Sequence, residues 1–168
     1  MRRLVPLLVL LAACSHAASS APGPSTSPPA LTPNATMVRV TDGDTITVRI
    51  DGQQEKVRLI GIDTPETKKP DTPVQCFGPE ATAFTTSLLP EGTPLHLERD
   101  VEPRDKYGRL LAYVYLATDG TFVNLQIVRQ GYARLLTFPP NVAHVDEFVE
   151  AARAAERDDI GLWAGCTG

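Results

Sequence analysis

The sequence is poor in residues that bind soft metals or carry thiol chemistry, with three cysteines and three histidines among 168 residues. Cys76 and Cys166 have no histidine pair nearby, so the usual zinc-ligand spacings are missing. An excess of basic charge is missing too. Beyond residue 36 the chain has 14 basic and 20 acidic residues, and therefore a formal charge of −6. This excludes a generally basic nucleic-acid coat, and a polyanionic substrate would have to meet a local basic patch.

Long apolar runs are also missing from the sequence. The run at residues 4–11 is too short to cross a bilayer as a helix. With 42% hydrophobic and 21% charged residues, the composition is that of a soluble globular protein rather than a disordered or multi-span membrane protein. The length matches one domain with a single core.

The N-terminus has the pattern of an export signal. Two arginines precede the apolar run at residues 4–11, which suits the core of a secretory signal peptide. Residues 11–14, Leu-Ala-Ala-Cys, are similar to a bacterial lipobox, so we expect a signal peptide over residues 1–13 and a lipid on Cys14. Cleavage after a later small residue such as Ala17 is the alternative. Both outcomes predict an extracytoplasmic protein, either anchored to the cell membrane or freely secreted.

Residues 14–36 are expected to form a tether behind the lipidated cysteine. The segment from Ser15 to Thr36 has five prolines and no charge, and it offers nothing that could bury a core. The folded domain is therefore expected over residues 37–168. Within it Cys76 and Cys166 form an even pair in an exported chain, which predicts a disulfide, with two separate buried thiols as the alternative.

The first part of the domain has a period of two, which predicts three strands joined by Asp-Gly turns. The inward positions would be Val38 and Val40, then Ile46, Val48 and Ile50, then Val57 and Leu59. Two more strands are expected near residues 95–97 and over residues 110–116. Helices are expected from Gly78 to Leu89, after a cap at Asn124, and from His144 to Arg157. We therefore predict an α+β domain, a five-stranded Greek-key β-barrel of the OB type with three packed α-helices.

Carboxylates and arginines gather in three short segments. Asp42 and Asp44 flank the glycine of the first hairpin turn. Arg58 lies in a strand whose neighbours face the core, so its side chain points outward, and Asp63 follows at the end of that segment. A third segment places Arg109 at the start of a strand. Oxygen ligands without histidine or cysteine favour Ca²⁺ or Mg²⁺. Together with two arginines they suit metal-assisted phosphodiester cleavage.

At these residues the chain resembles the staphylococcal nuclease (thermonuclease) family. The resemblance rests on six blocks in order: DGDT at 42–45, RLIGIDTPET at 58–67, FGPEATAF at 77–84, DKYGRLLAYVY at 105–115, VNLQIVRQGYA at 123–133 and GLW at 161–163. It implies an OB barrel with three helices. It also implies Ca²⁺-dependent cleavage of DNA and RNA to 3′-phosphorylated products.

The resemblance assigns roles to individual residues. Ca²⁺ would be bound by the carboxylates of Asp44 and Asp63 and by the backbone carbonyl of Thr64, with Asp42 in support. Glu66 would act as general base on the attacking water, and Arg58 and Arg109 would grip the scissile phosphate. We expect a monomer that acts on DNA and RNA and contacts the membrane only through its lipid anchor.

The chain departs from the family at one place. Where the best-known member has tyrosines that pack on and hydrogen-bond a bound nucleotide, this chain has Thr137, Phe138 and Pro139. Tyr132 lies nearby in sequence and is either a packing residue or a ligand. The alternative function is a catalytically inactive OB module that binds oligonucleotides or a protein. Degenerate copies of that kind lose the acidic and arginine positions, which this chain keeps, so the enzyme is favoured.

Overall fold

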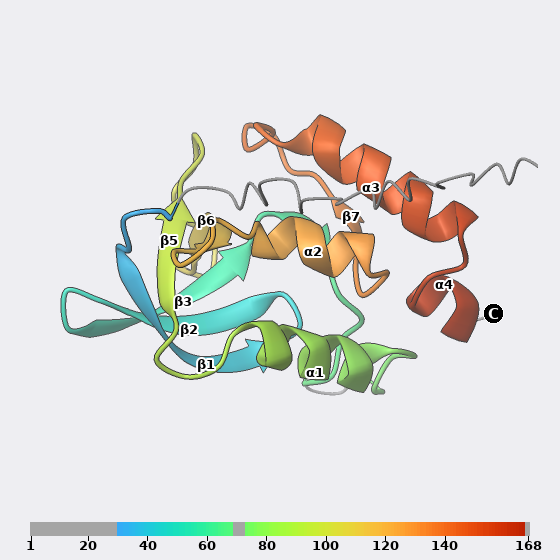
Figure 1. Ribbon diagram of the computed structural model, residues 1–168, viewed down its shortest axis with the longest axis horizontal. Helices are drawn as coiled ribbons and strands as arrows, with labels where there is room; N and C mark the ends of the chain where they lie inside the picture. Colours follow the sequence, from blue (N-terminus) through green and yellow to red (C-terminus); the bar gives the residue numbers. More distant parts are fainter. Residues whose placement is uncertain (1–29, 69–72, 167–168) are drawn as a thin grey trace, which may run out of the picture.

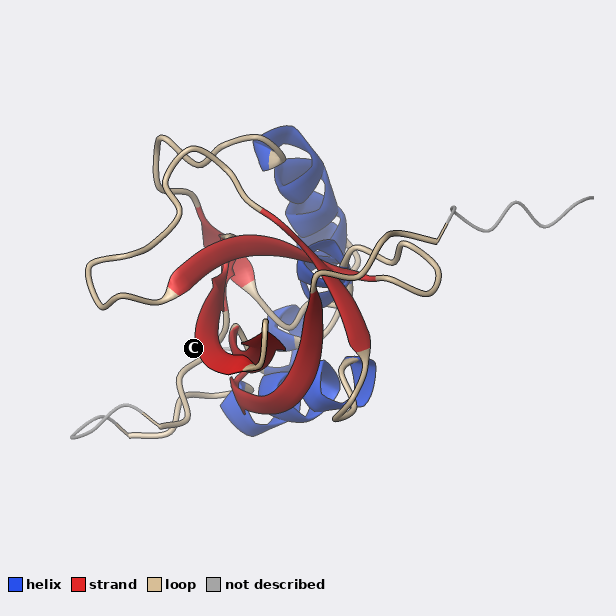
Figure 2. Ribbon diagram, turned by 90° about the vertical axis from the view of Figure 1, so that its left-hand side faces the viewer, coloured by secondary structure: helices blue, strands red, loops and turns tan. Residues whose placement is uncertain are grey.

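Five strands form the closed barrel that the sequence predicted. The computed structural model describes residues 30–68 and 73–166. Figure 2 shows the strands curling round one another. Neighbouring strands follow the order β1-β2-β3-β6-β5. β3 and β6 run parallel, and the other neighbouring pairs are antiparallel. The barrel strands are β1 (Ala35–Asp42), β2 (Thr45–Ile50), β3 (Gln53–Leu59), β5 (Pro94–Glu98) and β6 (Leu110–Leu116).

The three expected helices are present as α1 (Gly78–Leu88), α2 (Val123–Arg129) and α3 (Val145–Arg157). Figure 1 shows them to the right of the barrel strands, with α1 lowest, α2 in the middle and α3 uppermost. Three shorter elements were not predicted, because three or four residues are too few to display a period. They are the paired strands β4 (Gly61–Asp63) and β7 (Arg134–Leu136), and the helix α4 (Leu162–Gly165).

The inward positions of β2 and β3 are those that the alternation predicted, and Ile46, Val48 and Val57 are fully buried. In β1 the alternation predicted that Val38 and Val40 face inward, and only Val40 does, since it pairs with Ile46 and packs against the core. Met37 is 1% exposed, whereas Val38 is only partly buried. The pairing with β2 shifts between Met37 and Arg39. An irregularity of this kind moves the side chains to the other face.

Asn124 does not cap α2, which corrects the sequence-based expectation. The cap position is Phe122, and Asn124 is fully buried inside the first turn. Its side-chain oxygen accepts a hydrogen bond from the Val114 backbone N–H at 2.9 Å, and its Nδ2 donates to the carbonyl of Ile60 at 2.9 Å. Asn124 therefore joins α2 to β6 and to the residue between β3 and β4.

Contacts of the folded domain begin before residue 37. The Leu31 N–H donates to the Ala117 carbonyl at 2.8 Å, and the Asn34 side chain exchanges two hydrogen bonds with the backbone of Leu97. β1 itself begins at Ala35. The expected signal peptide and Cys14 lie outside the described residues. Within the described part of the chain, every helix is too short or too polar to cross a membrane.

Cys76 and Cys166 form the expected disulfide, with their Cα atoms 5.9 Å apart. The bond joins the segment before α1 to the end of α4. Next to it Phe77 stacks on Tyr132 with ring centroids 5.3 Å apart, and Tyr132 stacks on Phe84 at 4.2 Å. Tyr132 is therefore a packing residue, which settles the alternative that the sequence left open.

Loss of this disulfide should lower the stability of the domain. The two cysteines are 90 positions apart, and on the chain-entropy model a closed loop of that size contributes at most about 4–5 kcal/mol to the free energy of unfolding. We expect reduced protein to unfold at a lower urea concentration than oxidised protein. The Cys76→Ala/Cys166→Ala double variant, as control, should not respond to reductant. Equal midpoints for oxidised and reduced wild type would contradict this expectation.

Candidate functional site

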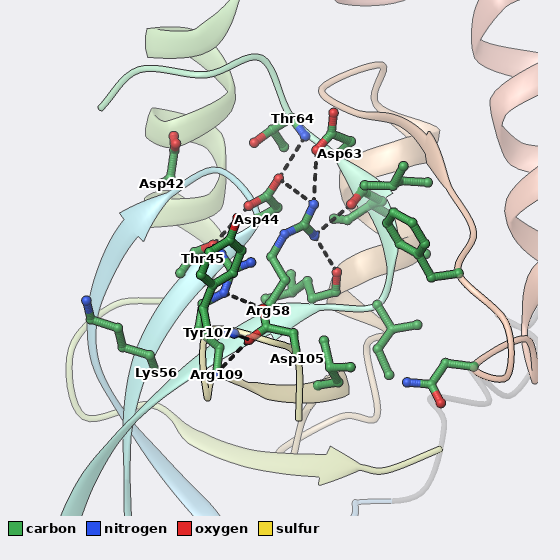
Figure 3. A pocket seen from close by; sticks show the side chains of 18 of the residues that line it. Asp42, Asp44, Thr45, Lys56, Arg58, Asp63, Thr64, Asp105, Tyr107 and Arg109 are labelled. Carbon is green, nitrogen blue, oxygen red and sulfur yellow. Dashed lines mark hydrogen bonds and ion pairs between the residues drawn. The ribbon is translucent and has the colours of Figure 1, made fainter. Parts of the chain in front are cut away.

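An open cleft of about 1220 Å³ on the barrel is lined by every residue that the sequence analysis assigned to Ca²⁺ or to catalysis. Its walls come from the β1–β2 turn, β3, β4 and the segments around residues 102–111 and 136–141. Figure 3 shows the charged side chains from these segments converging. The predicted residues in its lining are Asp42, Asp44, Arg58, Asp63, Thr64, Glu66 and Arg109.

The tight turn between β1 and β2 places Asp44 at the floor of the cleft. A Cβ atom on Gly43 would lie 2.7 Å from the Thr64 hydroxyl oxygen, so the turn packs directly against the segment after β4. The carboxylate of Asp44 accepts hydrogen bonds from the Thr64 N–H and from the Thr45 hydroxyl, both at 3.0 Å. Asp44 is only 7% exposed. Its position is therefore fixed by the turn and by Thr64.

Arg58 lies between two carboxylates. Its Nη2 is 3.2 Å from Oδ2 of Asp44 and 3.0 Å from Oδ1 of Asp63. Its Nη1 donates to the carbonyls of Leu59 at 2.6 Å and Ile62 at 2.7 Å. The outward direction expected for Arg58 is confirmed, since it pairs with Thr45 on the cleft side of β2. One guanidinium thus holds the β3–β4 corner and both acidic residues together.

The cleft has more negative charge at this point than Arg58 neutralises. Burial raises the pKa of Asp63 above its ordinary value. Repulsion by the carboxylates of Asp44 and Asp42 raises it further, and the attraction of Arg58 offsets this only in part. A second positive charge between Asp44 and Asp63 would favour ionisation of Asp63.

The donors at this point fit a hard cation such as Ca²⁺. The position between Asp44 and Asp63 already accommodates a cationic group, Nη2 of Arg58. Nearby, the Thr64 hydroxyl oxygen is buried without a partner among the described residues. Residues 30–68 and 73–166 contain no cluster of three or more Asp, Glu, His or Cys side chains that could hold a metal ion by themselves. A cation here would need backbone oxygens and water in addition, which is usual for Ca²⁺ with its six to eight oxygen ligands.

Asp42 holds the segment after β4 against α1. Its Oδ1 accepts hydrogen bonds from the hydroxyls of Thr67 at 2.9 Å and Thr82 at 3.1 Å, and from the Gly43 N–H. Burial opposes ionisation of Asp42. Hydrogen bonds with Glu66, Thr67, Gly43 and Thr82 outweigh burial and hold its pKa below the usual value. Asp42 thus contacts the residues around Glu66 more directly than it contacts Asp44 and Asp63.

Gln75 fixes the backbone of Glu66. No sequence pattern indicated a contact between these two residues. The Glu66 N–H donates to Oε1 of Gln75 at 2.8 Å, and the Gln75 N–H donates to the Glu66 carbonyl at 2.9 Å. Gln75 precedes Cys76, so the disulfide anchors the same segment. The Glu66 carboxylate in turn accepts from the N–H groups of Thr67 and Lys68. The orientation of Glu66 therefore depends on a partner nine residues away.

Arg109 reaches the cleft from the position just before β6. Its Nε donates to Oδ2 of Asp105 at 2.7 Å, and its Nη1 lies 3.5 Å from the Thr45 hydroxyl. Burial opposes ionisation of Asp105, but its hydrogen bonds from Arg109 and Tyr107 are stronger and hold its pKa below the usual value. Thr45 also bonds Asp44. The two arginines are therefore linked through Thr45 and Asp44, although they are far apart in sequence.

Aromatic side chains form the exposed rim of the cleft. The ring of Tyr107, 73% exposed, has its centroid 5.4 Å from the guanidinium carbon of Arg109. Phe138 is 69% exposed and lines the cleft together with Pro139. These rings offer stacking surfaces for flat groups at a site rich in arginine.

Comparisons with known proteins show which family the chain is similar to. A family model described as staphylococcal nuclease homologue matches residues 56–165. The chain is 46% identical over 125 residues to a thermonuclease of Staphylococcus intermedius, covering 74% of this chain and 73% of the relative. A thermonuclease of Staphylococcus hyicus is 41% identical over 128 residues, covering 76% and 74%. Endonuclease YncB of Bacillus subtilis (strain 168) is 41% identical over 133 residues, covering 78% of this chain and 62% of that protein.

Proposed function

The chain belongs to the staphylococcal nuclease family and is a nuclease. From that premise we propose that it hydrolyses DNA and RNA in a Ca²⁺-dependent reaction that leaves 3′-phosphorylated ends. The observation that carries the proposal is the single cleft in which Arg58 bridges Asp44 and Asp63 while Arg109 approaches the same turn. Water attacks phosphorus and gives a proton to Glu66, the bond to the 5′-oxygen breaks, and that oxygen takes a proton from solvent water and leaves as a hydroxyl group.

Ca²⁺ would be held by the carboxylates of Asp44 and Asp63 and by the carbonyl of Thr64. Once bound, it would neutralise phosphate charge. Arg58 now uses Nη2 for the same two carboxylates. A cation at those carboxylates would free Nη2 for a phosphoryl oxygen, while Nη1 stays on the carbonyls of Leu59 and Ile62. Binding of the cation and of the phosphate would then be mutually favourable.

Glu66 and Arg109 would act on the proton and the leaving group. The Glu66 carboxylate takes the proton of the attacking water as general base. Arg109 donates hydrogen bonds to the phosphoryl oxygens and to the departing 5′-oxygen, where negative charge grows in the transition state. Asp105 holds Nε of Arg109 and leaves the planar end of the guanidinium directed towards Thr45.

The protein is proposed to work outside the cytoplasm. A disulfide is typical of exported proteins, and the Cys76–Cys166 bond fits that setting. The apolar run at residues 4–11 and the lipobox-like residues 11–14 support export as a lipoprotein, with the chain between Cys14 and the first contacts of the domain near Leu31 as a tether. The domain is proposed to act as a monomer on extracellular nucleic acid.

Catalysis should fail selectively when the proposed groups are changed. Glu66→Gln and Arg109→Ala should each lower kcat by about 10²–10⁴-fold, because both side chains act chiefly in the transition state. Asp44→Ala should instead raise the Ca²⁺ concentration needed for half-maximal activity.

Plasmid DNA and total RNA should be digested with Ca²⁺ and left intact with EGTA. Wild-type protein that binds oligonucleotides but cuts nothing in millimolar Ca²⁺ would favour the inactive binding module.

Gln75 should prove to be a positioning residue for Glu66. Gln75→Ala removes the acceptor of the Glu66 N–H, so we expect kcat to fall by about tenfold or more with KM little changed. Gln75→Glu keeps an acceptor oxygen and should retain more activity than the alanine variant. Gln53→Ala, in the exposed β2–β3 hairpin, is the matched control. A purely structural Gln75 would lower stability without this split between kcat and KM.

Cys14 should decide where the mature protein is found. Cys14→Ala should release the protein from the membrane fraction or block its maturation, because the proposed lipid is attached to that thiol. Fractionation and mass spectrometry of the mature N-terminus measure this. Identical fractionation of the two proteins, with no lipid on the wild type, would favour simple secretion.

A further inference from the structure

A row of cations continues from the cleft along the outer face of β1–β3. On β3, alternate residues share one face, so Lys56 lies on the same side as Arg58. The pairing places Lys56 opposite Thr47 of β2, and Thr47 opposite Arg39 of β1. In the next row Arg49 lies opposite Gln54. We call Arg39, Arg49 and Lys56 the basic strip.

The basic strip is exposed and is not neutralised by neighbouring acids. All three side chains are exposed. Among the described residues, none of the three forms an ion pair with a carboxylate. The polar partner of Arg39 is the uncharged amide of Gln54, at 3.4 Å. Glu55, beside Lys56 in sequence, faces the other side of β3 and pairs with Arg104.

The outward positions of β2 and β3 carry no acidic residue within these strands. They are Thr45, Thr47 and Arg49 on β2, and Gln54, Lys56 and Arg58 on β3. This contrasts with the formal charge of −6 beyond residue 36. An acidic domain whose outward positions on β2 and β3 carry basic but no acidic residues has the local basic patch that a polyanion requires.

The basic strip is continuous with the proposed catalytic cleft. Lys56 lines the cleft, and Figure 3 shows it to one side of Arg58 and Arg109. Two residues along a strand span roughly 6.6 Å, close to the distance between successive phosphates of an extended nucleic-acid strand. A strand with its scissile phosphate at Arg58 would bring its next phosphates to Lys56 and then to Arg39 and Arg49.

We propose that the basic strip binds the sugar–phosphate backbone of a nucleic-acid strand beyond the scissile phosphate, so that the enzyme prefers long strands to short fragments. This inference rests on the proposed function. The contacts are to phosphates and carry no sequence preference. They strengthen substrate binding and leave the chemical step to the residues of the cleft.

The test uses the triple variant Arg39→Gln/Arg49→Gln/Lys56→Gln. The substrates are a long single-stranded oligonucleotide and a trinucleotide. We expect kcat/KM on the long strand to fall at least tenfold more than on the trinucleotide, mainly through KM. Three lost phosphate contacts should also reduce the slope of log(kcat/KM) against log salt concentration by about 2 on the long strand.

The control removes the same charge elsewhere, with Arg129→Gln/Arg153→Gln/Arg157→Gln on α2 and α3, whose side chains are exposed. It should lower activity on the two substrates by equal, small factors. An equal loss in control and strip variant would show that only net charge matters and would overturn the inference. The inference would also be wrong if the strip variant lost binding to anionic lipid vesicles but not to the long strand. A wild type that cuts neither substrate would instead contradict the proposed function.

Discussion

The site depends on one guanidinium group. Arg58 binds the carbonyls of Leu59 and Ile62 with Nη1 and the carboxylates of Asp44 and Asp63 with Nη2. These contacts fix the β3–β4 corner, keep two like charges close together, and set where an additional cation would lie. Removal of this positive charge would leave a largely buried carboxylate without its partner, which is far more costly than the loss of an exposed ion pair.

The surrounding structure positions the arginines and the proposed base in different ways. Arg58 lies on β3, and Arg109 immediately precedes the neighbouring β6. The inner faces of these two strands are buried, so the backbone at both arginines is firmly held. Glu66 is held differently, by its hydrogen bonds with Gln75 and by the contacts of Asp42 with Thr67 and Thr82. The disulfide lies beside Gln75 and also secures α4. A proton acceptor on such a segment is positioned by side-chain bonds rather than by the sheet.

An exposed basic strip adjoins a cleft of mixed charge on a domain that is acidic overall. The domain carries a formal charge of −6 beyond residue 36, which limits nonspecific attraction to polyanions, whereas Arg39, Arg49 and Lys56 are exposed on the face of β1–β3 that adjoins the cleft. Two exposed aromatic rings at the rim, Tyr107 and Phe138, offer stacking surface. Local fields of this kind guide a substrate to one place on the surface.

Local features of this protein could be predicted from its sequence: the period of the strands, the Asp-Gly turns, the three longer helices, the even pair of cysteines and the motifs that bear the acidic and arginine residues. Features that depend on partners far along the chain came only from the folded molecule. The pairing shift that buries Met37, the buried bridge made by Asn124, the hold of Gln75 on Glu66 and the approach of Arg109 to Thr45 have no local pattern. Periodicity reports which face of an element is buried. Contacts between distant residues depend instead on how the closed barrel brings its strands and loops together. Gln75 bonds Glu66 across 9 residues, and Arg109 approaches Thr45 across 64 residues.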